Sequence, residues 1–556
     1  MKNTSYKKGI LVVIMAFLTI SACDDKLAEI NTNPFAIDPA DANANLLMPT
    51  VLGPSAVNYL NMGIGDMGGA MQHTQKSGWA GGHNFYDWGG ADWTGYFNIL
   101  RTNELLIETA NGKGLPFHEG VGLTMRAFLF GQVADYWGDA PYTFALKGDQ
   151  GEDQFTYPQY DSQESLYASV IADLEAASAL FATGDDTAID SNFDLYFGGD
   201  MAAWEKFANS LLIRYHVRIS EKSTASKAAV EAIVSSGKYI SSSSEDATMD
   251  YTGGSDDVWP LFYENETSST RYQACKTLID QMNATNDPRI SVWFAPAQVR
   301  WVQDILISGT DEKMRIDGVV SDILPDWIDY RGRTETFTRH YNPNDVTMDD
   351  NEYVGIPAGI LASENNTFNG NPVGGQGRHN IHASMLTETF MDGKATAGDM
   401  LQSRLVSASE MHFTLAEMAI NGWNVGDAQT HYESAIMNSL ETWGVADQYS
   451  TFIADVPFDG TVEQVITQKW VASFSSAAEA WNDYKRTGFP VLSVGNGATA
   501  NVPAIRFGYG SDELVNNTDN VNNAISNLET TDFSGSLGKD SPYSRQWLLQ
   551  GTGKPW

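Results

Sequence analysis

The feature that most constrains the fold is a set of apolar residues at helical spacing that follows Asp200. Its positions are Trp204, Phe207, Leu211, Leu212, Tyr215 and Ile219. Steps of three and four residues place these side chains on one stripe of a helix, with Glu205, Lys206 and Arg214 outside it. Asp200 is suited to cap the helix, because its side chain can accept a backbone hydrogen bond. The spacing therefore predicts an amphipathic helix that packs against other elements.

Other segments repeat this spacing and predict a mainly α fold. They are residues 166–174, 404–421, 428–440 and 462–474. Asp161 and Glu164 have the spacing of a capping box ahead of the first, and Thr461 opens the last. The short polar turn 422–427 joins two predicted helices into an antiparallel hairpin of tetratricopeptide type. Because no clean repeat consensus of about 34 residues is present, the spacing alone predicts helix pairs but no particular repeat.

The middle of the chain, from about residue 221 to 402, has a different composition. Ser, Gly, Asn and Asp cluster at 241–244, 253–257 and 365–377, which predicts loops with short strands. Helical segments on both sides favour a single domain over residues 46–556 with this stretch as a loop-rich insertion. Binding residues concentrate on loops carried by a scaffold, so we expect the ligand here.

The charge balance narrows the possible ligands. The 556-residue chain has 34 Lys and Arg against 70 Asp and Glu, a formal net charge of −36. A surface this acidic repels phosphate backbones and anionic headgroups. We therefore expect no nucleic-acid partner, and membrane contact only through an anchor.

The N-terminus has the pattern of a lipoprotein signal. Lysines precede a short apolar run at 10–20, which is too short to span a bilayer but suits a signal peptide over residues 1–22. It ends in Ile-Ser-Ala-Cys, which resembles the lipobox of bacterial lipoproteins. Cys23 is therefore the expected lipid anchor. The alternative is an ordinary secretory signal with a chance cysteine.

Residues 23–45 are polar and form the expected tether. Asp24 and Asp25 resemble the surface-export signal of Bacteroidetes lipoproteins, so we expect the outer membrane, with the protein facing the exterior. No later segment approaches about eighteen consecutive apolar residues, which argues against a transmembrane helix.

Motifs for catalysis or cofactors are weak in this sequence. Cys275 is the only other cysteine, which excludes a disulfide framework and a cysteine zinc site. Residues 63–68 match G-x-G-x-x-G but lack a preceding strand, so we interpret them as a flexible turn. His379 and His382 lie near glycines and are expected in an exposed loop rather than on a metal. We predict a binding protein and not an enzyme, with no metal and no cofactor.

Segments in order along nearly the whole chain resemble the SusD/RagB family of nutrient-binding outer-membrane lipoproteins. They are NTNP at 31–34, ADYWGDAPY at 134–142, YDSQESLY at 160–167, DMAAWEKFANSL at 200–211, NDPR at 286–289, YVGIP at 353–357, QKW at 468–470 and EAWNDYKRTGFP at 479–490. The resemblance implies a right-handed superhelix of tetratricopeptide-type helix pairs and a loop-rich, ligand-binding half. It also implies a partner, a SusC-type TonB-dependent transporter barrel over which the lipoprotein sits as a lid. The helical spacing of three tryptophans within these segments predicts that they lie in the hydrophobic core; they are Trp204, Trp470 and Trp481.

The loop 79–88 has the composition of a carbohydrate-binding surface. Trp79, Tyr86 and Trp88 offer aromatic faces for sugar rings, and Asn84 can reach hydroxyl groups. Its glycines would let these rings protrude. The alternative is that the tryptophans plug the superhelix.

A second candidate set lies in the loop-rich middle. Trp301, Trp327 and Tyr330 could form an aromatic arc, and Tyr263 is a weaker member. These positions rest on local composition, because no family motif includes them.

The predicted function is capture of an oligosaccharide or polysaccharide and its delivery to the transporter. A peptide-binding member of the same family is the first alternative. A surface glycoside hydrolase is the second, because the many carboxylates could include a catalytic pair. Asp349, Asp350 and Glu352 could bind calcium, although a solvated acidic turn is favoured.

Overall fold

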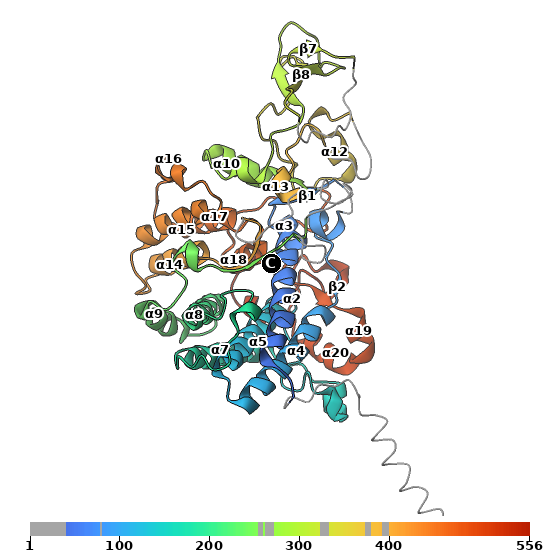
Figure 1. Cartoon of the computed structure of the whole chain (residues 1–556). Coiled ribbons are helices and arrows are strands. Elements are labelled where there is room, and N and C mark those ends of the chain that lie inside the picture. Colours follow the sequence, from blue (N-terminus) through green and yellow to red (C-terminus); the bar gives the residue numbers. More distant parts are fainter. Residues whose placement is uncertain are drawn as a thin grey trace, which may run out of the picture.

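Helices form most of the computed structural model, which describes residues 41–77, 80–253, 259–261, 272–322, 333–372, 380–391 and 400–556 (Figure 1). The longer helices are α2 (Ala44–Ile64), α4 (Thr94–Lys113), α5 (Pro116–Tyr136), α7 (Gln163–Phe181), α8 (Met201–Arg218), α9 (Ser226–Ser236), α10 (Lys276–Ala284), α14 (Ala408–Ile420), α15 (Ala428–Thr442), α17 (Val462–Ala472), α18 (Ala477–Thr487) and α20 (Thr518–Ser526). The shorter ones are α3 (Asp66–Ala70), α6 (Asp153–Thr156), α11 (Ile290–Trp293), α12 (Ala362–Thr367), α13 (Glu388–Met391), α16 (Tyr449–Asp455), α19 (Ser511–Asn516) and the π segment η1 (Gly81–Phe85). The predicted mainly α class is confirmed.

Consecutive helices pack as hairpins, and the hairpins stack on one another. α4 packs on α5, α7 on α8, α14 on α15, and α17 on α18. α5 also packs on α7, α8 on α14, and α14 on α17, so the pairs form one continuous stack around α2 (Figure 1). The predicted hairpin through the turn 422–427 is present between α14 and α15.

Side-chain caps define where several of these helices begin. Asp200 accepts hydrogen bonds from two backbone N–H groups of α8, and Thr461 caps α17, as predicted. The predicted capping box at Asp161 is wrong, because Ser162 caps α7 instead. Asp161 turns away and accepts hydrogen bonds from the backbone N–H groups of residues 142 and 143, at 2.9 and 2.8 Å.

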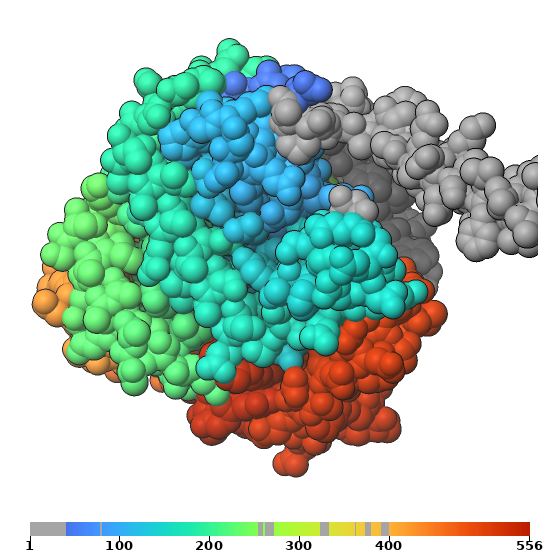
Figure 2. Space-filling model, turned by 90° about the horizontal axis from the view of Figure 1, so that it is seen from below, coloured from blue at the N-terminus to red at the C-terminus, as the bar shows by residue number. Residues whose placement is uncertain are grey.

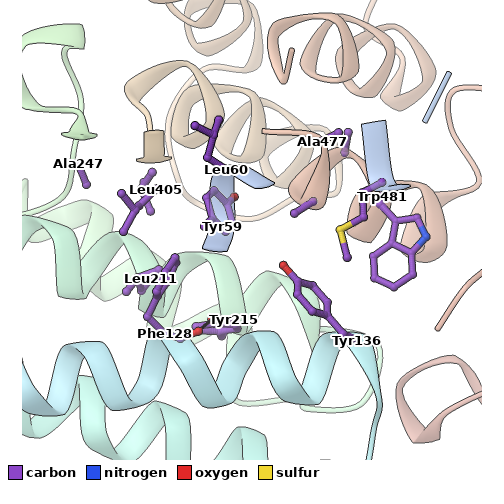
Figure 3. Close-up of a cluster of buried hydrophobic side chains, with 14 of the residues drawn as sticks. Tyr59, Leu60, Phe128, Tyr136, Leu211, Tyr215, Ala247, Leu405, Ala477 and Trp481 are labelled. Carbon is purple, nitrogen blue, oxygen red and sulfur yellow. Dashed lines mark hydrogen bonds between the residues drawn. The ribbon is translucent and has the colours of Figure 1, made fainter. Parts of the chain in front are cut away.

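Helix α2 lies at the centre of the helical half. Tyr59 and Leu60 project from it into a cluster that receives side chains from α5, α8 and α18 (Figure 3). The Tyr59 and Phe128 rings lie 5.4 Å apart. α2 is buried on several sides, so it lacks the one-sided pattern that reveals a surface helix.

The strands are short and belong mostly to the loop-rich half. They are β1 (Thr74–Lys76), β2 (Gly90–Ala91), β3 (Ala247–Asp250), β4 (Tyr272–Ala274), β5 (Arg300–Gln303), β6 (Arg315–Ile316), β7 (Val319–Val320), β8 (Phe337–Tyr341), β9 (Gln402–Val406) and β10 (Gly508–Tyr509). The largest sheet has the order β5-β8-β6-β7 and projects at one end of the molecule (Figure 1). The predicted helix 404–421 in fact begins at Ala408, because its first residues pair with β3 as strand β9.

Charged side chains are sealed inside the helical stack. The Arg214 guanidinium lies 2.7 Å from Glu410, and Arg218 is paired with both Asp135 and Glu479. All five side chains are at most 10% exposed. Arg214 was expected outside the apolar stripe of α8; it is buried because neighbouring helices supply its counter-charges.

The glycine-rich segment 63–68 is a tightly packed helix junction and not a flexible turn. A Cβ on Gly63 would come 2.5 Å from the carbonyl oxygen of Ser475, and one on Gly68 would come 2.8 Å from that of Gly63. Neither position has room for a side chain, which explains the glycines.

We expect Arg218→Ala to lower the free energy of unfolding by about 3–5 kcal/mol, because it removes the charged partner of Asp135 and one of the two charged partners of Glu479 in the core. Urea denaturation measures this change. Lys227→Ala is the matched control, since its pair with Glu231 is half exposed and should contribute less than about 0.5 kcal/mol. Similar losses of unfolding free energy in the two variants would contradict a larger contribution from the buried ion pairs.

We expect stability to fall as pH decreases from about 6.5 to about 4. Burial lowers the pKa of His73 and His118 to about 4 and the pKa of His83 and His382 to about 3. The unfolded chain then binds protons that the folded chain does not, at a cost of roughly 2 kcal/mol per histidine at pH 5. Urea denaturation between pH 7 and 5 tests this. His73→Gln should reduce the change in the free energy of unfolding over that pH range. A flat profile would contradict it.

Candidate functional site

A small pocket lies where the helical stack meets the loop-rich half, with a volume of about 350 Å³ including space open to solvent. It is lined by Gly63, Ile64, Gly68, His73, Thr74, Trp259, Leu261, Tyr272, Leu386, Phe390, Phe474 and Ser475. The end of α2, strands β1 and β4, helix α13 and the α17–α18 connection all contribute. Among these described lining residues there is no Asp, Glu, Lys or Arg, so the pocket presents no formal charge while its histidine is neutral.

Aromatic rings form the rigid walls of this pocket. Phe474 stacks on Trp293 behind it, with centroids 4.5 Å apart. Trp259 packs edge-on against Phe390 at 6.2 Å. Tyr272, on β4, is partly exposed, and the Lys76 ammonium lies 4.7 Å from the centre of its ring. Flat apolar walls of this kind suit a ring-shaped ligand with apolar faces.

Three polar side-chain atoms of the lining residues are buried without a hydrogen-bond partner among the described residues. They are Nδ1 of His73, Nε1 of Trp259 and Oγ of Ser475. Such atoms are uncommon in folded proteins, because burial without a partner costs about 1–3 kcal/mol each. Each of these atoms has almost no accessible surface, so a ligand with hydroxyl groups would reach it only when the surrounding side chains move.

His73 is held as a hydrogen-bond acceptor. Its Nε2 lies 2.9 Å from the carbonyl oxygen of Trp470, which can only accept, so Nε2 carries the proton. Burial lowers the pKa of His73 to about 4, so the ring is neutral near pH 7 and Nδ1 keeps its lone pair. The pocket wall thus contains an acceptor at His73, a donor at Trp259 and a hydroxyl at Ser475, all three of them buried.

Ser475 has a left-handed backbone, with a φ of 69°. Non-glycine residues are seldom found there, and such strain is often associated with functional sites. The close approach of Gly63 to the Ser475 carbonyl holds this part of the wall against α2.

The predicted aromatic surface at 79–88 is not exposed where the structure describes it. Asn84, Tyr86 and Trp88 are at most 4% exposed. Asn84 bonds both backbone groups of Lys76 at 2.8 Å, and Trp88 stacks on Phe507 at 4.5 Å. The expectation of protruding rings is wrong for Tyr86 and Trp88, because Tyr543 bonds the Tyr86 backbone and Phe507 and Trp481 pack against Trp88. The alternative, a tryptophan plug, is correct for Trp88, and Trp79 lies outside the described residues.

The second predicted set is also not an exposed arc where it is described. Trp301 is 3% exposed, its ring stacks on His382 at 4.6 Å, and its indole donates to the carbonyl oxygen of Asn369. The expected exposed loop is wrong at His382, whose side chain is fully buried, and His379 lies outside the described residues. Tyr263, Trp327 and Tyr330 lie outside the described residues.

The pocket residues were missed by sequence reasoning. His73 and Ser475 are about 400 positions apart in the chain, and neither belongs to a recognisable motif. The left-handed Ser475 follows a helix end without glycine and gives no local signal. Trp259 could have been noticed only as one tryptophan among 15.

The aspartates of the acidic turn near residue 350 accept hydrogen bonds from other residues of this chain. Asp350 accepts hydrogen bonds from Gln303 and Tyr341, and Asp349 accepts from the backbone and side chain of Asn351. Across the part of the chain that the structure describes, no group of three or more His, Cys, Asp or Glu residues could hold a metal ion.

A sequence profile of the SusD-like family, described as starch-binding and associating with the outer membrane, matches residues 55–315 and 315–510. The chain belongs to this family. No curated protein matches this SusD-like chain. Among its described helices, none is both long and apolar enough to cross a membrane.

Solved SusD homologues share the fold of this SusD-like protein. One from Bacteroides fragilis has a TM-score of 0.68 at 20% identity, covering 91% of this chain and 99% of that one. One from Bacteroides uniformis has a TM-score of 0.64 at 22% identity, covering 90% and 99%. A chitin-binding SusD homologue from Flavobacterium johnsoniae has a TM-score of 0.64 at 19% identity, covering 91% and 99%. The predicted SusD-like fold is confirmed.

We expect Ser475→Ala to leave the free energy of unfolding unchanged or raise it by about 1 kcal/mol, because it removes a buried hydroxyl that has no partner. Ser473→Ala is the matched control, since that hydroxyl donates to the Lys469 carbonyl oxygen at 2.8 Å and its loss should cost about 1 kcal/mol. Chemical denaturation compares the two. An equal loss in both would show that Ser475 has a structural partner.

Proposed function

We propose that this SusD-like protein captures a neutral saccharide and passes it to a TonB-dependent transporter. The observation that carries the proposal is the aromatic pocket, whose described lining residues include no Asp, Glu, Lys or Arg and whose wall holds three unpartnered polar atoms. Sugar rings combine apolar CH faces with hydroxyl groups that both donate and accept, and the aromatic rings and polar atoms of the pocket wall match these two kinds of group. The family is described as starch-binding, and a structural relative binds chitin; both polymers are neutral.

We place the protein at the outer face of the outer membrane, anchored through Cys23. The lipobox-like sequence before Cys23 supports the anchor, although it lies outside the described residues. The transporter partner rests on the family resemblance. Trp79, Tyr263, Trp327 and Tyr330 remain predicted contacts for the saccharide, since each adds an aromatic ring to a predicted loop.

The pocket chemistry favours a saccharide over the two alternatives. A peptide carries charged termini, and none of the lining residues that are described would neutralise them. A glycoside hydrolase needs two carboxyl groups beside the scissile bond, and the described lining contains neither Asp nor Glu. The pocket therefore supports binding without hydrolysis.

We expect one of two soluble glycans, starch or glycol chitin, to retard the mature protein in an affinity gel. Trp259→Phe should weaken that binding at least about tenfold, because it removes the unpartnered indole N–H from the pocket. Trp293→Phe is the matched control, since it also removes a buried, unpartnered indole N–H but does not line the pocket.

Three outcomes would count against the proposal. Equal weakening in the two variants would remove the pocket from the binding surface. No retardation, together with calorimetric heat from a peptide mixture, would assign the protein to a peptide-binding branch. Release of shorter glycan products during the assay would support the hydrolase.

A further inference from the structure

A second concavity lies away from the pocket, between the start of α4, the segment 141–158 and the α19–α20 junction. Its volume is about 950 Å³ including space open to solvent, and an adjoining compartment of about 430 Å³ shares Trp93, Thr94 and Glu513 with it. We call the two compartments together the trough. On the face drawn in Figure 2, the blue atoms border the cyan ones, and the red atoms lie on the other side of the cyan ones.

One stripe of α4 forms the first wall of the trough. Thr94, Phe97, Asn98 and Arg101 all line it, and their spacing of three and four residues places them on one face of the helix. Trp93 is 5% exposed and forms the base, where its indole donates to the Glu513 carboxylate at 3.2 Å. This wall therefore combines an aromatic base with amide, hydroxyl and guanidinium groups.

An exposed aromatic ring stands at the opposite rim. Tyr157 is 52% exposed, yet its backbone is held on two sides. Its carbonyl oxygen accepts a hydrogen bond from Asn520 at 3.0 Å, and the next carbonyl, of Pro158, accepts one from Asn517 at 2.8 Å. A ring on a fixed backbone loses little conformational entropy when it stacks on a ligand.

The backbone of the trough is also strained at one apolar position. Leu146 lines it and has a φ of 62°, which a branched side chain rarely adopts. Strain of this kind persists only where the surroundings impose it, and it is often found beside ligands.

The polar groups of the trough determine which ligands it could accept. Asp92 and Asp512 line the smaller compartment, so a polyanion would be repelled. Carboxylates accept hydrogen bonds from hydroxyl groups, while Asn98 and Asn516 can both donate and accept. The combination of a free tyrosine face, an aromatic base and these polar groups suits a neutral polyhydroxylated chain.

We propose that the trough is a second saccharide-binding site, with Tyr157 as its stacking platform. This inference rests on the proposed function, because it assigns the same class of ligand. Two sites on one protein let a polymer bind in both places, so the second contact forms at a high effective concentration. The trough therefore increases retention of a polymer much more than affinity for a short oligosaccharide.

Isothermal titration of the full mature chain with maltohexaose and with chitohexaose tests the proposal. We expect two molecules of one hexasaccharide to bind the wild type and one to bind Tyr157→Ala. Tyr157→Phe keeps the ring and should keep both. Val515→Ala is the control, because Val515 is 75% exposed on α19 but does not line the trough. In affinity gels with the parent polymer, Tyr157→Ala should reduce retention at least tenfold.

The failures of the two proposals are distinguishable. If the wild type binds one hexasaccharide and Tyr157→Ala changes nothing, the trough is not a saccharide site while the pocket proposal stands. If Trp259→Phe and Tyr157→Ala each remove one site, both proposals are supported. If the wild type binds neither hexasaccharide nor either polymer, both are overturned. Binding of a tripeptide that is lost in Tyr157→Ala would overturn the saccharide assignment in favour of a peptide groove.

Discussion

The helical stack depends on the charges that are sealed in its core. Two arginines one turn apart on α8 meet carboxylates from α5, α14 and α18; the five residues are Arg214, Arg218, Asp135, Glu410 and Glu479. These helices lie far apart in the sequence, so all the charges are paired only when the helix pairs have stacked in the native order. An unpaired buried charge is costly, and stackings that leave one unpaired are therefore strongly disfavoured.

This stacking order also builds the pocket. Glu479 lies on α18, and Ser475 lies four residues before it, in the connection from α17. Once α18 is held against α8, the Ser475 carbonyl is placed against Gly63 at the end of α2. The same end of α2 leads through α3 to His73 and β1, which pairs with β4 and so brings Tyr272 to the pocket.

The net charge of −36 contrasts with a pocket whose described lining residues include no Asp, Glu, Lys or Arg. A protein this acidic gains solubility from its surface and has no electrostatic attraction for polyanions. Its affinity must then come from apolar contact and hydrogen bonds, which are the interactions that neutral glycans offer. The shared fold with SusD homologues, at about 20% identity, shows that this framework tolerates extensive change in its side chains. Under our proposal, the ligand is determined by the few residues of the pocket and, by our further inference, of the trough.

Local signals in the sequence predicted helices α7, α8, α14, α15 and α17, the caps Asp200 and Thr461, and the core role of Trp204, Trp470 and Trp481, because periodicity and capping act over a few residues. They also predicted short strands between residues 221 and 402, where most of the strands lie. They did not determine which aromatic residues are exposed: Trp88 and Trp301 have the composition of a binding surface, yet distant segments cover them. The pocket joins residues near positions 70, 260, 390 and 475, and α2 lacks a one-sided pattern because it is buried on several sides. Burial and long-range contact are properties of the packed chain, so only the tertiary structure decided where the candidate pocket lies.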